Sequence, residues 1–181
     1  MLIAQLSDPH LMPGVRLFGR LDTAGYLERA IAHLNALEPD AVLITGDLTN
    51  DGDAPVYAAF AAMVARLRAP FFVLTGNHDD RALIRQTFAA AGYLPGKGPL
   101  CYALDRFAVR VIALDTLVPG EPCGQLGAEQ LAWLDARLCE APDKPTMVAL
   151  HHPPFRTGIG HLDRSMLRDA DALAAVIGRH P

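Results

Sequence analysis

The sequence is poor in cysteine, in net positive charge and in long apolar runs, and each shortage argues against a class of protein. Its three cysteines, Cys101, Cys123 and Cys139, stand far apart without a C-x-x-C pair. This spacing argues against a disulfide framework and a thiolate zinc site, and it is typical of free thiols in a reducing cytosol. The formal net charge is -4, so we expect no broad basic face that would bind a nucleic-acid polymer.

No apolar run approaches the roughly 20 residues that span a bilayer. The N-terminus runs directly into Asp8 and lacks the basic segment of a signal peptide. We therefore expect a cytoplasmic protein without a membrane partner. An anionic substrate would have to be attracted by bound cations, because the chain offers no lysine- and arginine-rich patch.

What the chain does contain is an alternation of strand-like and helical patterns. Of its 181 residues 51% are hydrophobic and 20% are charged, which predicts one globular domain with a real core. A tight hairpin is expected at Asp105-Arg106, and Thr23 is expected to cap the first helix. The pattern predicts an α/β protein with a mainly parallel sheet covered by helices. The expected strands cover 2–7, 41–45, 71–75, 100–104, 107–114 and 146–150, and the expected helices cover 23–37, 54–67, 80–91, 128–138 and 164–179.

Short polar clusters follow four of the predicted strands. In parallel sheets, ligands bind beyond the carboxyl ends of the strands. Each cluster taken singly is compatible with an ordinary turn, a helix cap or a surface histidine. Together they supply carboxylate, amide and imidazole donors without thiolate, a set that suits Mn, Fe, Co or Zn and predicts a two-metal site for phosphate esters. The clusters are Asp8-Pro9-His10, Gly46-Asp47, Gly76-Asn77-His78-Asp79 and His151-His152.

The residue types suggest different tasks within this site. Asp8 and His10 are two residues apart, so in an extended segment both would point to one side and grip one cation. The carboxylate of Asp47 has two oxygens and can bridge two cations. His78 could donate a proton to a phosphate oxygen or to a leaving group.

Adjacent side chains diverge after a strand, so we expect one histidine of the pair His151-His152 to be a ligand and the other to support it. The remaining polar residues near these clusters are expected to be structural. Asn50, Asp51 and Asp53 are interpreted as turn residues, Asp79 and Asp80 as helix caps, Asp115 as structural, His33 as a helix-face residue and His180 as solvated, and the role of His161 is open.

The order of these motifs resembles that of the calcineurin-like metallophosphoesterase superfamily, whose pattern is D-x-H, G-D, G-N-H-[DE], H and G-H-x-H. The first four occur here in order, as Asp8-Pro9-His10, Gly46-Asp47, Gly76-Asn77-His78-Asp79 and His151. The stretches 17–23 and 151–154 further resemble the branch that contains class III cyclic-nucleotide phosphodiesterases and glycerophosphodiesterases. The resemblance implies an αββα sandwich with a dinuclear centre of Fe, Mn, Co or Zn.

The resemblance also implies roles for individual residues. Asp8 and His10 would bind the first metal, Asp47 would bridge both metals, and Asn77 and His151 would bind the second. His78 would stabilise the transition state or protonate the leaving alkoxide, and His152 would support the ligands from behind. Asn77 and His78 would contact substrate. Apart from the resemblance, the loop that bears Arg16 is a further expected substrate contact. The implied activity is hydrolysis of a small phosphodiester, a cyclic nucleotide or a glycerophosphodiester, by a metal-bridging hydroxide that attacks phosphorus.

The G-H-x-H motif of the superfamily is absent from this sequence. We therefore expect residues 1–181 to be a C-terminally truncated metallophosphoesterase domain with an incomplete second sheet. Three alternatives to a competent phosphodiesterase stay open: an inactive fragment, a noncatalytic scaffold of the same fold, and a phosphomonoesterase. A homo-oligomer in which another subunit supplies the absent ligands is a further expectation.

Overall fold

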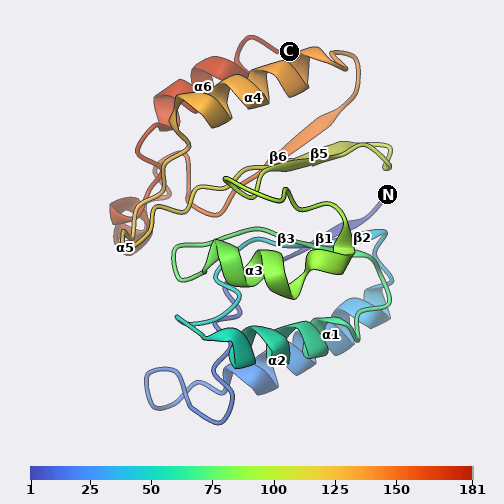
Figure 1. Ribbon diagram of the computed structural model, residues 1–181, viewed down its shortest axis with the longest axis vertical. Helices are drawn as coiled ribbons and strands as arrows, with labels where there is room; N and C mark the ends of the chain where they lie inside the picture. The colour runs from blue at the N-terminus through green and yellow to red at the C-terminus, as the bar shows by residue number, and fades with distance from the viewer. Residues whose placement is uncertain (181) are drawn as a thin grey trace.

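The computed structural model describes residues 1–180 and is layered as helices, sheet, sheet and helices (Figure 1). Both sheets have three strands. The first is parallel, in the order β1 (Ile3–Leu6), β2 (Ala41–Ile44), β3 (Phe71–Val73). The second has the order β4 (Tyr102–Leu104), β5 (Arg110–Ala113), β6 (Thr146–Ala149), with β4 antiparallel and β6 parallel to β5.

The helices cover the two outer faces of this sandwich (Figure 1). Below the first sheet lie α1 (Thr23–Leu37), α2 (Ala54–Val64), α3 (Arg81–Thr87) and the 3-10 turn η1 (Ala89–Ala91). Above the second lie α4 (Gly127–Cys139) and α6 (Ala170–Ile177), with the short α5 (Gly160–Arg164) at the edge. Among residues 1–180, no helix has the length and apolar character needed to cross a membrane.

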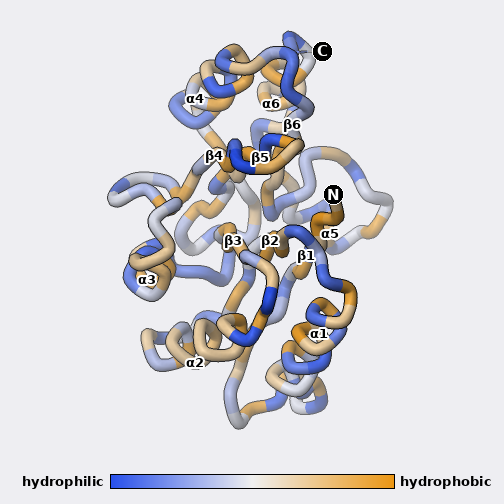
Figure 2. The backbone as a smooth tube through the Cα atoms, turned by 90° about the vertical axis from the view of Figure 1, so that its right-hand side faces the viewer, coloured by the Kyte–Doolittle hydropathy of each residue, from blue (hydrophilic) through white to orange (hydrophobic). Residues whose placement is uncertain are grey.

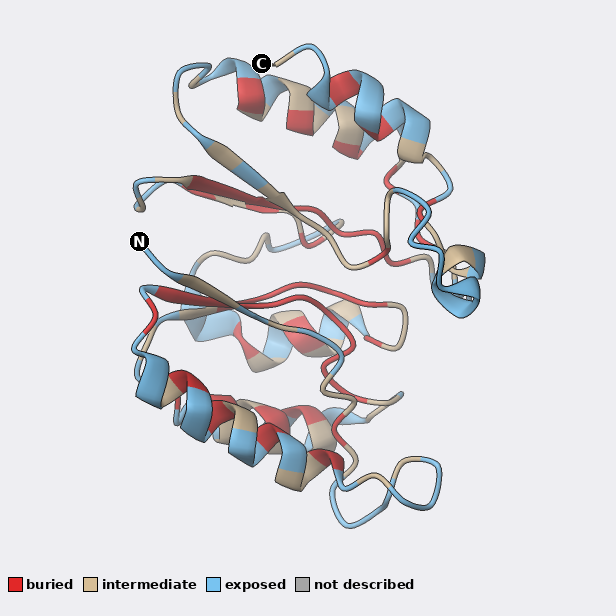
Figure 3. Ribbon diagram, turned by 180° about the vertical axis from the view of Figure 1, so that it is seen from behind, coloured by how far each residue is buried: buried red, intermediate tan, exposed pale blue. Residues whose placement is uncertain are grey.

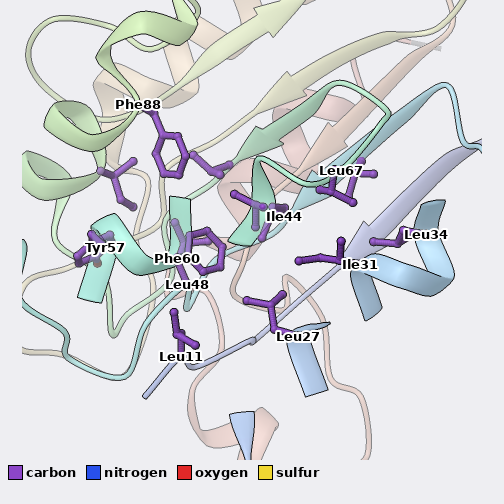
Figure 4. Packing of buried hydrophobic residues seen from close by; sticks show 14 of the residues in the cluster. Leu11, Leu27, Ile31, Leu34, Ile44, Leu48, Tyr57, Phe60, Leu67 and Phe88 are labelled. Atoms are coloured by element: carbon purple, nitrogen blue, oxygen red, sulfur yellow. The ribbon is translucent and has the colours of Figure 1, made fainter. Parts of the chain in front are cut away.

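The alternation of side chains in β2 explains why one sheet is buried on both faces. Val42 and Ile44 pack against α1, α2 and α3 in one cluster (Figure 4), whereas Ala41 and Leu43 pack against the second sheet. Successive side chains in a strand point to opposite faces, so a wholly apolar strand fills two cores. The central strands β2 and β5 and the inward faces of the helices are buried, the edge strands β1 and β6 are only partly buried, and the outer helix faces are exposed and hydrophilic (Figures 2 and 3).

The structure confirms the α/β class and corrects several boundaries. The strands form two sheets rather than one mainly parallel sheet, and the β4–β5 hairpin loop runs over 105–109 instead of two residues. The predicted helix 80–91 is divided into α3 and η1. The predicted helix 164–179 is shortened to α6, and its first residue, Arg164, is the last residue of α5. Leu167 and Arg168 are not helical, because their backbone N–H groups hydrogen-bond to the carbonyls of Pro153 and Gly124.

Helix caps also differ from expectation. Asp22, not Thr23, caps α1 by accepting from the Gly25 N–H, and Thr23 Oγ1 accepts from the Met12 N–H instead. Asp53, interpreted as a turn residue, is the N-cap of α2. Asp80 caps α3 as predicted, accepting from two backbone N–H groups. These caps fix where the helices begin, and therefore the length of the loops that precede them.

Candidate metal centre

The polar clusters that follow β1, β2, β3 and β6 meet in one place. His10 Nε2 lies 3.3 Å from Asp47 Oδ2 and 3.7 Å from Asp8 Oδ1. His151 Nε2 lies 3.6 Å from the same Asp47 oxygen and 3.3 Å from Asn77 Oδ1. The Asp47 carboxylate therefore stands between two imidazoles that come from different sheets. The five residues predicted as ligands are brought together.

The first two loops reach this geometry through left-handed backbone conformations. The φ angles of Asp8, His10 and Asp47 are 55°, 41° and 52°. The segment Asp8–His10 is therefore not extended, and the alternation argument for its two side chains was wrong. The loop after β1 is instead held along the loop after β2, with Asp8 N donating to the Gly46 carbonyl and His10 N to the Asp47 carbonyl. Such left-handed non-glycine residues cluster at functional sites.

The donor set around His151 fits a cation. His151 Nδ1 lies 2.9 Å from the Thr45 carbonyl oxygen, which can only accept, so Nδ1 carries the proton. In the neutral ring Nε2 then keeps its lone pair, which faces Asn77 Oδ1 and Asp47 Oδ2. Two ligand atoms bound at right angles, each about 2.1 Å from one metal, are roughly 3 Å apart. The separations of 3.3 and 3.6 Å are close to that value.

The electrostatics around His10 favour positive charge at the same place. The Asp8 carboxylate raises the pKa of His10, and Asp47 adds to this effect. Burial raises the pKa of Asp8, but hydrogen bonds with His10 and Ser7 outweigh it and hold that pKa below its usual value. Of the three sets of side chains among residues 1–180 whose ligand atoms lie within 4.8 Å of one another and could hold a metal ion, two are at this place: Asp8, Asp47 and His151, and His10, Asp47 and His78. The third, Asp135, Cys139 and His180, lies elsewhere.

His78 lies at the edge of this site. Its ring is oriented by Asp51, a residue interpreted from the sequence as part of a turn. The backbone N–H of His78 donates to Asp47 Oδ1 at 2.9 Å, and the His78 ring packs edge-on against His10. His78 Nδ1 lies 3.1 Å from Asp51 Oδ1. Because a carboxylate can only accept, Nδ1 donates and Nε2 stays available. The only sequence signal for Asp51 was its place in the same turn as Asp47.

His152 lies directly beside His151. It is buried, its Nδ1 lies 2.7 Å from Thr116 Oγ1, and its ring meets that of His151 edge-on. Burial and the neighbouring His151 lower the pKa of His152 to about 4. The ring is therefore neutral at physiological pH and packs against His151, and its supporting role stays a prediction.

Two aspartates have partners that the sequence did not reveal. Asp79 is buried and does not cap α3; it accepts hydrogen bonds from Leu48 N, Gly76 N and Tyr57 OH. Asp115 is fully bonded as well. Its carboxylate accepts from Thr75 Oγ1, from the Arg81 guanidinium and from the backbone N–H groups of Leu100 and Leu117.

Four of the five candidate ligands, all except His10, line a cavity of about 470 Å³. His161 and two neighbours on α5 form another wall of this cavity. Arg16 does not line it: the side chain is exposed and donates to the Arg20 carbonyl within its own loop. His180 is not simply solvated, since its Nε2 lies 2.7 Å from Asp135 Oδ1. The cavity is lined by Asp8, Asp47, Asn77, His78, His151, His152, Pro153, His161, Leu162 and Ser165.

Comparison of the sequence with known proteins identifies similar families and relatives. The model of the calcineurin-like phosphoesterase family matches residues 1–177. The chain is 34% identical over 186 residues to the glycerophosphodiester phosphodiesterase GpdQ of Enterobacter lignolyticus, covering all of the chain and 67% of the relative. It is 33% identical over 184 residues to the 3',5'-cyclic adenosine monophosphate phosphodiesterase CpdA of Escherichia coli K12, covering 99% and 65%.

The chain thus spans about two thirds of the length of these curated relatives. Among solved structures, a dimetal phosphatase from Danio rerio superposes with a TM-score of 0.73 at 13% identity, covering 98% of this chain and 77% of that one. At that identity the likeness concerns the fold, which is the same layered sandwich. With a family model that matches nearly every residue, the chain belongs to the calcineurin-like phosphoesterase family.

Proposed function

We propose that this protein is a metal-dependent phosphodiesterase that hydrolyses small phosphodiesters, either cyclic nucleotides or glycerophosphodiesters. The observation that carries the proposal is the meeting of four strand-end loops around the Asp47 carboxylate. The names of the relatives support the substrate class, since one is a glycerophosphodiester phosphodiesterase and another a cyclic-nucleotide phosphodiesterase. We treat residues 1–181 as one catalytic domain of a cytoplasmic protein, which would be free to associate with a second copy.

The side chains divide the work as follows. Asp8 and His10 would hold one divalent cation, Asn77 and His151 would hold another, and Asp47 would contribute to both sites. Oxygen and imidazole donors without thiolate suit Mn, Fe, Co or Zn. When bound, the cations supply Lewis-acid activation of the phosphate and of a water molecule. The protein's own part is to fix the five ligands, which it does through backbone hydrogen bonds between loops.

His78 has a separate task beside the ligands. The Asp51 carboxylate accepts a hydrogen bond from Nδ1–H, so the ring is held with Nε2 free. In its protonated form His78 presents an Nε2–H that can stabilise or protonate the leaving oxygen of the ester. Asn77 and His78 line the cavity beside the ligands and are therefore the proposed substrate contacts, whereas Arg16 lies away from it.

The cavity suits a small ester rather than a polymer. Its volume of about 470 Å³ is in the range of small-molecule sites. A nuclease that tracks a long phosphate backbone needs an extended basic surface, and this chain has a formal net charge of -4. A single small phosphodiester is therefore the proposed substrate.

Turnover of bis(p-nitrophenyl) phosphate, measured with metal content, tests the proposal. The protein should bind divalent metal and hydrolyse this diester, and Asp47→Ala should lose both properties. His33→Ala, an exposed change on α1, is the matched control and should keep both. Metal binding without turnover would favour a noncatalytic scaffold, and faster turnover of p-nitrophenyl phosphate would favour a phosphomonoesterase. Equal activity in Asp47→Ala would refute the assignment of this residue.

A further inference from the structure

The proposed function assigns no role to the buried carboxylate of Asp79, which lies beside the candidate metal centre. Asp79 is 8% exposed and belongs to the loop after β3, which also carries Asn77. Its Oδ2 accepts from Gly76 N at 2.9 Å, and its Oδ1 accepts from Leu48 N at 3.1 Å and from Tyr57 OH at 2.9 Å. All three partners are donors, so the carboxylate is used only as an acceptor.

The bond that Leu48 N donates to Asp79 is one half of a reciprocal pair of hydrogen bonds between the two loops. Asp47, on the loop after β2, accepts from the N–H of His78 on the loop after β3. Asp79, on the loop after β3, accepts from the N–H of Leu48 on the loop after β2. Each loop therefore contributes a carboxylate and a backbone amide to the other. The separation of the two loops, and with it the placing of Asp47 against Asn77, depends on both carboxylates.

The two loops leave no room for an alternative arrangement. A Cβ placed on Gly46 would lie 2.6 Å from Gly76 N and 2.7 Å from His151 Nδ1. The loops are therefore in backbone contact, and a change in their hydrogen bonds cannot be absorbed by filling a gap. A shift between them would move the candidate ligands of both cations.

Tyr57 connects the hydrogen-bonded pair of loops to the helices beneath the first sheet. Its ring is fully buried in the cluster beneath the first sheet, on α2. The hydroxyl donates to Asp79 and accepts from the Asp80 N–H at 2.8 Å, directly before α3. A rigid aromatic side chain thus fixes the Asp79 carboxylate from below, so the position of the ligand loops is tied to the packing of α2 and α3.

We propose that Asp79 and Tyr57 are positioning residues that hold Asp47 and Asn77 at the spacing the metal ions require. The inference rests on the proposed ligand roles of Asp47 and Asn77. Asp79→Asn keeps the shape but turns one acceptor oxygen into an NH₂ group facing donors. Tyr57→Phe removes one donor from Asp79 and the acceptor of the Asp80 N–H. Loss of such supporting groups typically weakens metal binding by roughly 10- to 100-fold.

Titration with Co²⁺, followed by calorimetry and by the visible absorption of the bound ion, tests the inference. Asp79→Asn and Tyr57→Phe should lower Co²⁺ affinity roughly 10- to 100-fold and alter the absorption band. Ile31→Ala, a buried core change on α1, is the control for lost stability alone. It should melt at a lower temperature but keep wild-type affinity and the wild-type band.

Wild-type affinity in Asp79→Asn, or an equal loss in Ile31→Ala, would overturn the inference while leaving the proposed function intact. If Asp79→Asn does not fold, Tyr57→Phe decides by the same criteria. Absence of Co²⁺ binding by the wild-type protein would overturn the proposed function, and the inference with it.

Discussion

Replacing Gly46 with alanine should damage stability and metal binding together, because this glycine is where the ligand loops touch. Its φ of 98° lies in a backbone region that residues other than glycine rarely adopt. The new Cβ would meet Gly76 N at 2.6 Å and Gly76 Cα at 2.8 Å, which are backbone atoms with no freedom to rotate away. Relief is possible only if the loops after β2 and β3 move apart.

The expected cost follows from these two effects. Left-handed backbone strain costs an L-residue about 1–2 kcal/mol, and forcing an extra methyl group into a packed site costs about 1–3 kcal/mol. The lower entropy of the unfolded alanine chain returns about 0.4–1 kcal/mol. The free energy of unfolding should therefore fall by about 1–4.6 kcal/mol. The upper part of that range is a large share of the about 5–15 kcal/mol of a typical domain.

Alanine substitutions at two other glycines separate the cost of backbone strain from the cost of the steric clash. Gly120 has a φ of 77° but nothing within 4 Å of its added Cβ, so Gly120→Ala should cost only about 1 kcal/mol. Gly96 has neither a positive φ nor a close neighbour, so Gly96→Ala should be neutral or slightly stabilising. Urea unfolding measures the free energy of unfolding of the three variants, and Co²⁺ titration measures the metal affinity of each. If Gly46→Ala matched Gly120→Ala in stability and kept wild-type affinity, the contact argument would be refuted.

Further predictions concern the side chains around and beyond the site. Asp51→Asn should lower kcat on the order of 10-fold while KM and metal content stay unchanged, since only the orientation of His78 is lost; unchanged kcat would reject this role. Asp80→Ala should remove the N-cap of α3 and about 1 kcal/mol of unfolding free energy, measured in urea. Burial raises the pKa of Cys101 to about 11, so at pH 8 iodoacetamide should modify exposed Cys139 first, with Cys101 following as pH rises. Mass spectrometry of the peptides would expose any reversal of that order.

The sequence predicted the fold wherever the deciding interactions are local. Helical spacing placed α1 over 23–37, as observed, because the apolar residues that face the core repeat along one segment. The run 164–179 has a similar pattern but is broken, since Leu167 and Arg168 bond to distant carbonyls. Boundaries that depend on such long-range partners cannot be read from periodicity. The ligand roles and the residue that protonates the leaving group stay predictions.

What the sequence determined by itself is the inventory of the site: carboxylate, amide and imidazole donors placed directly after four apolar strands. What only the tertiary structure decided is how these loops are held against one another. Asp79 was interpreted as a helix cap, yet it bonds to Leu48, 31 residues away, and Asp51 bonds to His78, 27 residues away. The physical reason is that backbone periodicity acts over one or two turns, whereas the separation of ligand loops is set by hydrogen bonds that form only after two strands have paired.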